Sequence, residues 1–220
     1  GMIQVVGGGD PPTSSAEVLD LNAATPTWRT VRPMAVARRQ VNSTVLPDGT
    51  VLVTGGTSAA GFNTASGAVF SAELWNPDTE TWTTMASATV PRLYHSAAFL
   101  LADGRVAVTG GDDQPVPEIF SPPYLFKGAR PTLTAAPAQI AYGQRFTVQS
   151  AEAAGIRKVT LIRLSSVTHA FNMDQRLNVL PFTPGTGSLD VAAPANANLA
   201  PPGHYLLFVV NANGVPSVGS

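Results

Sequence analysis

The feature that most constrains the fold is a strand-like segment ending in a double glycine, which occurs three times in the first half of the chain. The copies occupy residues 3–8, 51–56 and 106–111. Hairpin-type Asp-Gly turns at residues 47–50 and 102–105 precede the second and third copies, which begin 55 residues apart. Trp28 and Trp82 recur at a similar interval of 54 residues. A period near ~50 residues with this order of features predicts blades of a kelch-type β-propeller.

The number of blades is too small for a ring. Residues 2–126 hold about three blades at ~50 residues each, whereas a closed propeller needs about four to eight. An ordinary β-sandwich with glycine-rich turns is the weaker alternative, because strand, double glycine and tryptophan recur in phase. We therefore predict an all-β fold whose first domain, residues 1–128, is a partial propeller that cannot close by itself.

The repeat stops near residue 128, and residues 129–220 have a different pattern. Short apolar runs at irregular spacing are separated by turn residues, and no amphipathic helix is visible. This pattern predicts a small immunoglobulin-like β-sandwich, with residues 204–210 as its central, doubly buried strand. Residues 165–176 are longer and more polar than a simple turn requires, so we expect them to form a projecting finger.

Composition excludes several functions. Charged residues make up 12% of the chain, the net charge is -1, and basic residues do not cluster, so neither nucleic acid nor an anionic membrane is an expected partner. No apolar run approaches the ~18 residues of a membrane span. No signal peptide follows Met2, and Gly1 resembles a scar left by removal of a tag. The chain has no cysteine, which excludes disulfides and thiolate metal ligands.

The candidate site starts from Tyr94 and His95, which lie side by side just before an apolar run. A phenol and an imidazole are mixed N,O donors of the kind that suits Cu(II). The alternative is a half-buried aromatic residue beside a surface histidine. The other two histidines, His169 and His204, lie in the second domain, so a shared site would lie between the domains. His204 begins an apolar strand after Pro202 and Gly203, and we interpret it as a surface residue.

These motifs resemble a known family, the copper-radical oxidases galactose oxidase and glyoxal oxidase. Arg92-Leu93-Tyr94-His95-Ser96 followed by an Asp-Gly-Arg turn looks like their Tyr-His copper motif. Residues 167–176 look like the finger that carries their last histidine ligand. Residues 201–211 and 214–217 are similar to the end of their early-set domain. The resemblance covers essentially the whole chain.

The resemblance implies roles for four residues. Tyr94 would be the axial, catalytic phenol, and together with His95 and His169 it would hold one copper ion. Arg38 would contact substrate, with a solvated charge at a blade edge as the alternative. The sister blade has Arg39-Gln40 or neighbouring residues where Tyr94-His95 stand, so the blade scaffold does not itself require the pair. The family oxidises primary alcohols or aldehydes with O₂, releases H₂O₂, and folds as seven blades plus the sandwich.

Two departures from the family are informative. The family's radical cofactor is an equatorial tyrosine cross-linked to a cysteine, and this chain has no cysteine and only Gly1 and Met2 before the first strand. The family also continues with another strand where this chain ends, at Ser220. We therefore expect a C-terminal part of a copper-radical oxidase with a partial copper site, inactive alone. The residues do not distinguish copper from zinc, and the resemblance implies an extracellular or cell-surface location.

Two other functions stay open. One is a non-enzymatic carbohydrate-binding or cell-surface β module, and the other is a structural piece whose open edges pair with another copy. Expected partners are missing upstream blades or a second copy in a homodimer, and a carbohydrate or a small alcohol or aldehyde. The dimer prediction rests on apolar blade faces left without a neighbour. The side chains expected there are Val5, Leu19, Leu46, Val53, Leu74 and Phe99.

Overall fold

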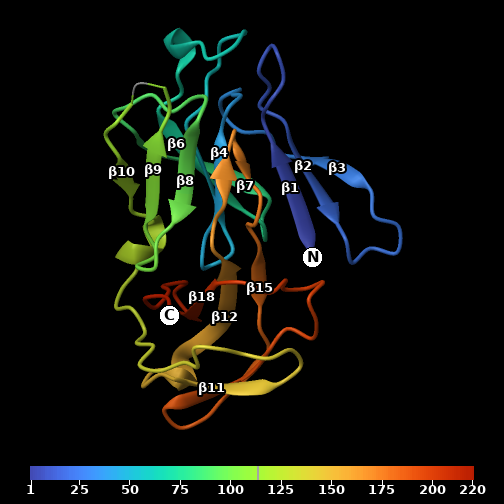
Figure 1. The fold of residues 1–220 in the computed structure, drawn as a ribbon, viewed down its shortest axis with the longest axis vertical. Coiled ribbons are helices and arrows are strands. Elements are labelled where there is room, and N and C mark those ends of the chain that lie inside the picture. Colours follow the sequence, from blue (N-terminus) through green and yellow to red (C-terminus); the bar gives the residue numbers. More distant parts are fainter. Residues whose placement is uncertain (113) are drawn as a thin grey trace.

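The computed structural model describes residues 1–112 and 114–220, and the regular secondary structure of this part of the chain is almost entirely β-strand (Figure 1). Its only helical segments are three short 3₁₀ turns: η1 (Ala65–Gly67), η2 (Pro123–Phe126) and η3 (Ala153–Gly155). No helix in this part of the chain is long and apolar enough to span a membrane. The predicted all-β class is therefore confirmed.

The first half consists of three antiparallel sheets, here called blades 1, 2 and 3. Blade 1 contains β1 (Met2–Val6), β2 (Ala16–Asp20) and β3 (Trp28–Val31). Blade 2 contains β4 (Asn42–Val45), β5 (Val51–Thr54), β6 (Ser71–Asn76) and β7 (Thr81–Ser87). Blade 3 contains β8 (Ser96–Leu100), β9 (Val106–Gly110) and β10 (Glu118–Phe120). Each blade follows the chain order, so strands that are consecutive in the sequence are neighbours in the sheet.

The blades pack face to face through apolar side chains. Blade 1 contributes Ala16, Val18 and Val31, which meet Val51 and Trp75 of blade 2. Burying a side chain of this size contributes about 1.5–3 kcal/mol. All four residues of β5 are buried, because blade 2 lies between two neighbours and has no solvent-facing side.

The position of each blade decides which apolar residues stay exposed. On blade 1, the strand pairing places Ile3, Val5, Leu19 and Trp28 on the face turned away from blade 2. We call these four residues the outer face of blade 1; Ile3, Val5 and Trp28 are 43%, 51% and 49% exposed.

The prediction of six exposed apolar side chains is therefore right for Val5 and wrong for Leu46 and Val53. Leu46 and Val53 are fully buried, because both belong to the middle blade. Leu19, Leu74 and Phe99 are half-buried.

The second half is a sandwich of two three-stranded sheets. One sheet has the order β11 (Arg145–Gln149), β17 (Ser188–Ala192), β16 (Phe182–Pro184), and the other β15 (Leu177–Val179), β12 (Ile156–Arg163), β18 (Tyr205–Asn211). The apolar core between the sheets includes Val148, Val159, Leu189 and Val209. β12 is the middle strand of its sheet, and β18 bonds to β12 on one side and to the C-terminal residues Val215, Ser217 and Ser220 on the other. As predicted, β18 is buried on both faces: Leu207 and Val209 lie in the sandwich core, and Phe208 lies in the core shared with the blades.

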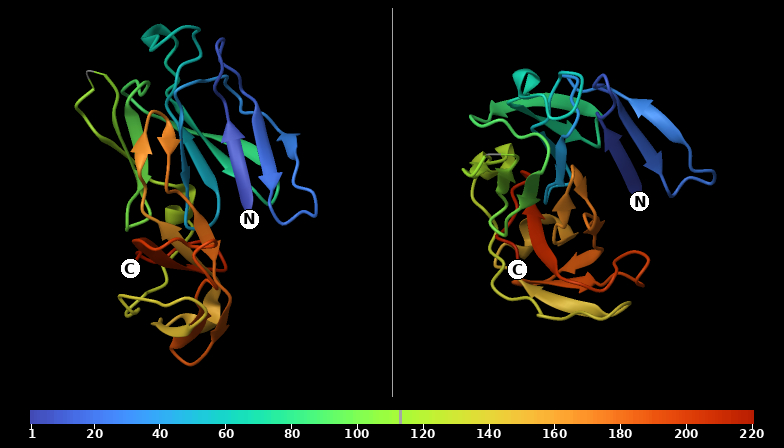
Figure 2. Two further views of the ribbon diagram at one scale, coloured as in Figure 1. Left: turned by 45° about the vertical axis from the view of Figure 1, so that its right-hand side comes forward. Right: turned by 45° about the horizontal axis from the view of Figure 1, so that its top comes forward.

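The sandwich lies next to the blades (Figure 2), and the two halves share one core. Ile162 and Phe208 of the sandwich lie in the same buried cluster as Leu52 of blade 2 and Val106 of blade 3. The sandwich also bonds to the hairpin turns of blades 2 and 3. Thr160 Oγ1 and Lys158 Nζ donate to the carbonyl oxygens of Pro47 (3.1 Å) and Asp48 (2.6 Å), and Arg130 donates to that of Asp103 (2.7 Å). This joint fixes the sandwich against the two blades next to the candidate site.

Candidate metal centre

His95 occupies a backbone position that the blade scaffold builds twice. It lies just before β8 with φ of 61°, in the left-handed region, and Gln40 lies just before β4 with φ of 57°. The strand register makes the two residues equivalent, because Asn42 faces Thr54 as Ala97 faces Thr109. Tyr94-His95 therefore corresponds to Arg39-Gln40. A non-glycine residue in this region carries a conformational cost of about 1–3 kcal/mol, so the turn belongs to the scaffold and the imidazole is the special feature.

His169 lies at the tip of a hairpin formed by β13 (Val167–Thr168) and β14 (Phe171–Asn172). The two turn residues, His169 and Ala170, have φ of 51° and 64°, as a two-residue type I′ turn requires. The hairpin is the orange segment that rises from the sandwich beside β4 and β8 (Figure 1). The prediction that residues 165–176 form a projecting finger is confirmed.

The base of the finger is tied to blade 2 by one side chain. Gln175 accepts from the backbone N–H of Val45 (2.7 Å) and donates from Nε2 to the carbonyl oxygen of Ser43 (3.1 Å). The amide of Gln175 thus bonds the free edge of β4 as a neighbouring strand would. Because of this bond, the finger enters the blades in a fixed position.

The two histidines meet at their Nε2 atoms, which are 3.3 Å apart. The ring of Tyr94 lies against both, with its centroid 3.8 Å from that of His95 and 5.4 Å from that of His169. The prediction that His95 and His169 converge is confirmed by this geometry. The separation suits two ligands of one ion, since each metal–nitrogen bond is about 2.0–2.1 Å long. The donor set of two imidazoles and a phenol fits copper.

Some neighbours of this site have no periodic sequence signal and were not predicted. The loop between β5 and β6 places Phe62 edge-on against Tyr94, with ring centroids 4.6 Å apart. Asn63 follows in that loop, and Asp112 approaches His95 from the loop after β9. Among residues 1–112 and 114–220, no cluster of three or more His, Cys, Asp or Glu side chains surrounds a single metal position, so a metal here would depend on the phenol.

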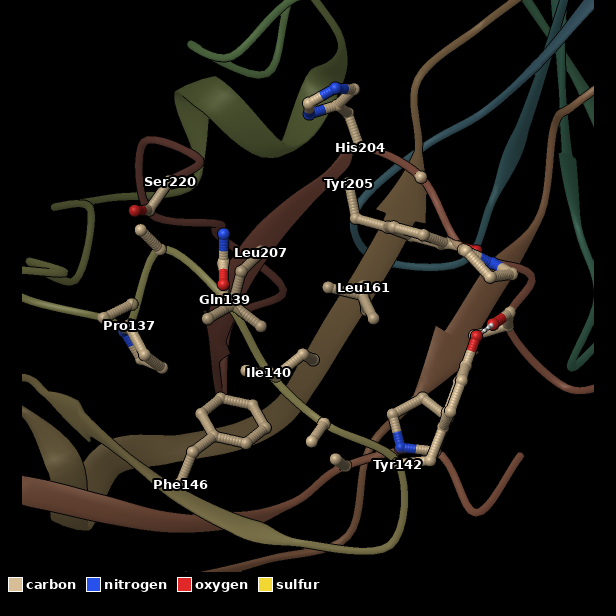
Figure 3. A pocket seen from close by; sticks show the side chains of 18 of the residues that line it. Pro137, Gln139, Ile140, Tyr142, Phe146, Leu161, His204, Tyr205, Leu207 and Ser220 are labelled. Atoms are coloured by element: carbon tan, nitrogen blue, oxygen red, sulfur yellow. Dashed lines mark hydrogen bonds between the residues drawn. The ribbon is translucent and has the colours of Figure 1, made fainter. Parts of the chain in front are cut away.

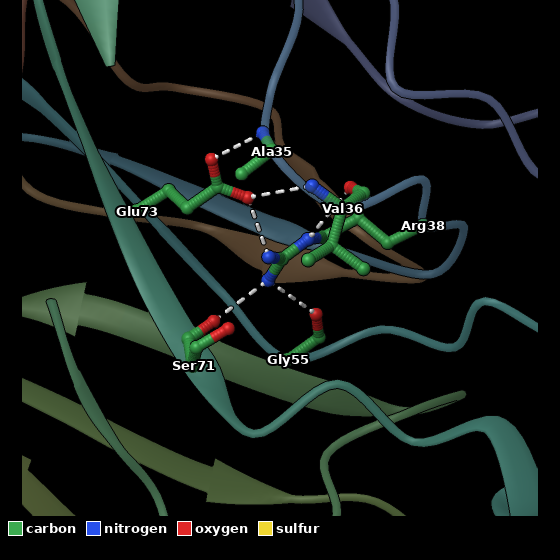
Figure 4. Close-up of polar contacts among 6 residues, drawn as sticks. All are labelled: Ala35, Val36, Arg38, Gly55, Ser71 and Glu73. Carbon is green, nitrogen blue, oxygen red and sulfur yellow. Dashed lines mark hydrogen bonds and ion pairs between the residues drawn. The ribbon is translucent and has the colours of Figure 1, made fainter. Parts of the chain in front are cut away.

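Arg38 does not contact solvent, so its interpretation as a solvated charge at a blade edge is wrong. Its side chain is fully buried and donates to Glu73 Oε1 (2.7 Å) and to the carbonyl oxygens of Ser71 (2.9 Å) and Gly55 (3.3 Å) (Figure 4). Glu73, also buried, accepts from the backbone N–H of Ala35 (2.7 Å). Burial lowers the pKa of the Arg38 guanidinium, and the Glu73 carboxylate opposes that shift. Arg38 joins strands of blade 2, and the substrate contact implied by the resemblance stays a prediction.

Arg92 makes the same type of connection in blade 3. Its buried guanidinium donates to the carbonyl oxygens of Gly110 (2.9 Å) and Val116 and lies 3.3 Å from Glu118 Oε2. We call the Arg38–Glu73 and Arg92–Glu118 pairs the blade brackets. The recurrence of an arginine before the first strand and a glutamate on a later strand was a sequence signal for them. Since Arg92 precedes Tyr94-His95 by only two residues, the second bracket anchors the metal centre.

His204 stays apart from the site, as predicted. It is exposed and lines a hollow of about 530 Å³ in the sandwich, together with Ile140, Phe146 and Tyr205 (Figure 3). The hydroxyl groups of Tyr142 and Tyr205 on its walls donate to the carbonyl oxygens of Ala200 (2.7 Å) and Pro201 (2.6 Å). None of the residues that line this hollow belongs to the metal centre.

The fold and the site together define an all-β protein in which two histidines and a tyrosine converge between the two halves of the chain. Residues 10–122 match the model of the glyoxal oxidase N-terminus, and residues 130–220 match that of the galactose oxidase-like early set domain. The chain therefore belongs to the glyoxal oxidase and galactose oxidase family of copper-radical oxidases.

Individual relatives agree with the family models. Aldehyde oxidase GLOX1 of Arabidopsis thaliana is 35% identical over 234 residues, covering 91% of this chain and 38% of that protein. Galactose oxidase of Gibberella zeae is 34% identical over 226 residues, covering 96% of this chain and 32% of that protein. A solved fungal alcohol oxidase in complex with copper superposes with a TM-score of 0.91 at 30% identity, covering 100% of this chain and 50% of that one. The chain spans about a third to two fifths of the length of these two sequence relatives.

Proposed function

We propose that this chain binds one copper ion through Nε2 of His95, Nε2 of His169 and the phenol of Tyr94, as a C-terminal part of an alcohol or aldehyde oxidase. The observation that carries the proposal is the convergence of the two Nε2 atoms to 3.3 Å from opposite halves of the chain. A copper complex of a structural relative supports copper as the metal. The extracellular or cell-surface location implied by the family resemblance belongs to the same proposal.

Each side chain has a separate task in this site. His95 is held on blade 3 by the left-handed turn, and His169 is delivered by the finger. The ring of Phe62 packs against that of Tyr94, which limits the access of water to that side of the phenol. The bound metal would supply one-electron redox chemistry. Because the site takes ligands from both halves, binding requires the docked arrangement of finger and blade.

We further propose that the chain does not turn over alone. Oxidation of an alcohol to an aldehyde removes two electrons, and a single copper ion accepts one of them. The family resemblance assigns the second to a tyrosine cross-linked to a cysteine, and the sequence contains no cysteine. The residues present therefore support metal binding without the second redox partner.

Copper titration into the metal-free chain tests the binding proposal. We expect one equivalent of Cu(II), measured by calorimetry and electron paramagnetic resonance, and at least a tenfold loss of affinity in His95→Ala and in His169→Ala. His204→Ala is the matched control and should bind as wild type does, and competition with Zn(II) decides between the two metals. Unchanged copper binding by the His95→Ala, His169→Ala double variant would refute the site. Release of H₂O₂ from galactose, glycerol or methylglyoxal above a copper-only blank would refute the inactivity.

A further inference from the structure

A closed ring of hydrogen bonds links the Tyr94-His95 turn to the side chains of Asn63 and Asp112. His95 Nδ1 lies 3.3 Å from Asp112 Oδ1, and Asn63 Nδ2 donates to Asp112 Oδ2 at 2.7 Å. Asn63 Oδ1 in turn accepts from the backbone N–H of Tyr94 at 3.3 Å. The ring joins three segments: the loop between β5 and β6, the Tyr94-His95 turn and the loop after β9. Asn63 therefore holds Asp112 in place and also bonds the backbone of the Tyr94-His95 turn.

The two oxygens of Asp112 have different partners, and this decides what His95 can do. A neutral imidazole has one nitrogen that donates and one that accepts, and an ionised carboxylate only accepts. The Nδ1 atom that faces Asp112 must therefore carry the hydrogen. Nε2 of the neutral ring then presents a free lone pair, which is the form that binds a metal.

We propose that Asp112, oriented by Asn63, is the positioning residue that fixes His95 in its metal-binding tautomer. The role of Nε2 as a ligand rests on the proposed copper function, whereas the tautomer does not. A carboxylate on the outer nitrogen of a metal-bound histidine fixes ring orientation and raises ligand basicity. Asp112 lies outside the metal-binding set and acts only through His95.

His169 has no comparable support, so the two histidines are unequal. Its Nδ1 lies 2.6 Å from Thr168 Oγ1, and a hydroxyl can either donate or accept. Because the two Nε2 atoms bond each other and His95 Nε2 has no hydrogen, His169 Nε2 must donate in the metal-free chain. His169 Nδ1 then accepts from Thr168. Of the two histidines, only His169 must then change its tautomer when a metal binds: Nε2 loses its proton to solvent, Nδ1 gains one from solvent, and the Thr168 hydroxyl rotates.

Nitrogen NMR of the ring atoms in the metal-free protein tests this directly, at a pH where both rings are neutral. We expect His95 with hydrogen on Nδ1 and His169 with hydrogen on Nε2. Asp112→Ala should abolish the preference of His95 and lower Cu(II) affinity about 10–100-fold, with a changed paramagnetic resonance spectrum. Asp112→Asn keeps an accepting oxygen and should restore part of both properties. Asp78→Ala, an exposed aspartate in a hairpin turn of blade 2, is the matched control.

The two proposals fail in different ways. A wild-type His95 with hydrogen on Nε2, or an Asp112→Ala variant with the wild-type tautomer, would overturn the positioning role. The expected tautomers in a protein that binds no copper would uphold the positioning role and refute the proposed function. Melting curves of each variant show whether the fold is intact. If Asp112→Ala unfolds, the tautomer of Asp112→Asn decides.

Discussion

Two arginines lie in the interior of the blades, in a chain whose charged residues make up only 12%. Each blade bracket binds residues from several strands of one blade, with Arg38 reaching Gly55 after β5 and Ser71 and Glu73 on β6. A buried ion pair is costly to desolvate, and breaking it leaves an uncompensated charge in the interior. The brackets therefore matter less as net stabilisers than as devices that allow only one arrangement of these strands.

At the residue scale, Glu73→Ala should be strongly destabilising. The substitution removes the acceptor of Arg38 and of the Ala35 N–H, and loss of one partner of a buried pair costs about 3–5 kcal/mol. The free energy of unfolding is measured from urea denaturation with the m-value held constant. Glu80→Ala, which removes the exposed partner of Arg29, is the control and should change stability little. Equal effects of the two substitutions would contradict the role given to the bracket.

At the scale of one element, the finger combines firm attachment at its base with strain at its tip. Gln175 fastens the base to β4, whereas His169 and Ala170 both take left-handed backbone angles. Glycine or asparagine is the usual choice for such a turn. The alanine therefore keeps the turn geometry at a conformational cost, at the point where a metal ligand must be presented.

The strain can be tested with Ala170→Gly. Because glycine reaches φ of 64° without a Cβ penalty, we expect a gain of about 1 kcal/mol in the free energy of unfolding. Ala197→Gly, in an exposed turn without a positive φ, should instead destabilise slightly, since it frees the unfolded chain. Thermal melting of both variants gives the comparison. A loss of stability in Ala170→Gly would show that the turn carries no such strain.

At the scale of the whole molecule, the outer face of blade 1 is an apolar surface against which no other described sheet packs. Ile3, Val5 and Trp28 are about half exposed there, and Glu17 and Thr30 lie beside them on the same face. Contiguous apolar side chains of this size indicate an association site. We propose that a second copy covers this face in a two-fold homodimer, with the sandwich outside the contact.

Val5→Lys tests the dimer. Val5 pairs with Glu17 across the sheet, so a lysine there gains an opposite charge and should leave the blade folded. We expect light scattering at micromolar concentration to give twice the chain mass for the wild type and the chain mass for Val5→Lys. Val179→Lys, an exposed position on β15 of the sandwich, should remain dimeric. A monomeric wild type would refute the proposal.

The sequence predicted what is repeated or contiguous and missed what depends on distant partners. The recurring double glycine predicted the three blades, and the polar run around His169 predicted the finger. The burial of Arg38 was missed, because its partner Glu73 lies 35 residues away on another strand and only the recurrence of an arginine and a later glutamate in two blades signals the pairing. Leu46 and Val53 were misjudged because an apolar pattern does not tell which blade has two neighbours. Asn63 and Asp112 lie in loops, where polar residues have no period.

The division of the metal centre between the two halves has a thermodynamic consequence. His95 belongs to blade 3 and His169 to a finger of the sandwich, so an ion held by both would act as a clasp across the joint. Ligand that binds only the docked state stabilises it by about 1.4 kcal/mol for each tenfold rise in concentration above the dissociation constant. Blades and sandwich would then unfold as one cooperative unit when the ion is bound. The concentration of free metal would set the free energy that holds the two halves together.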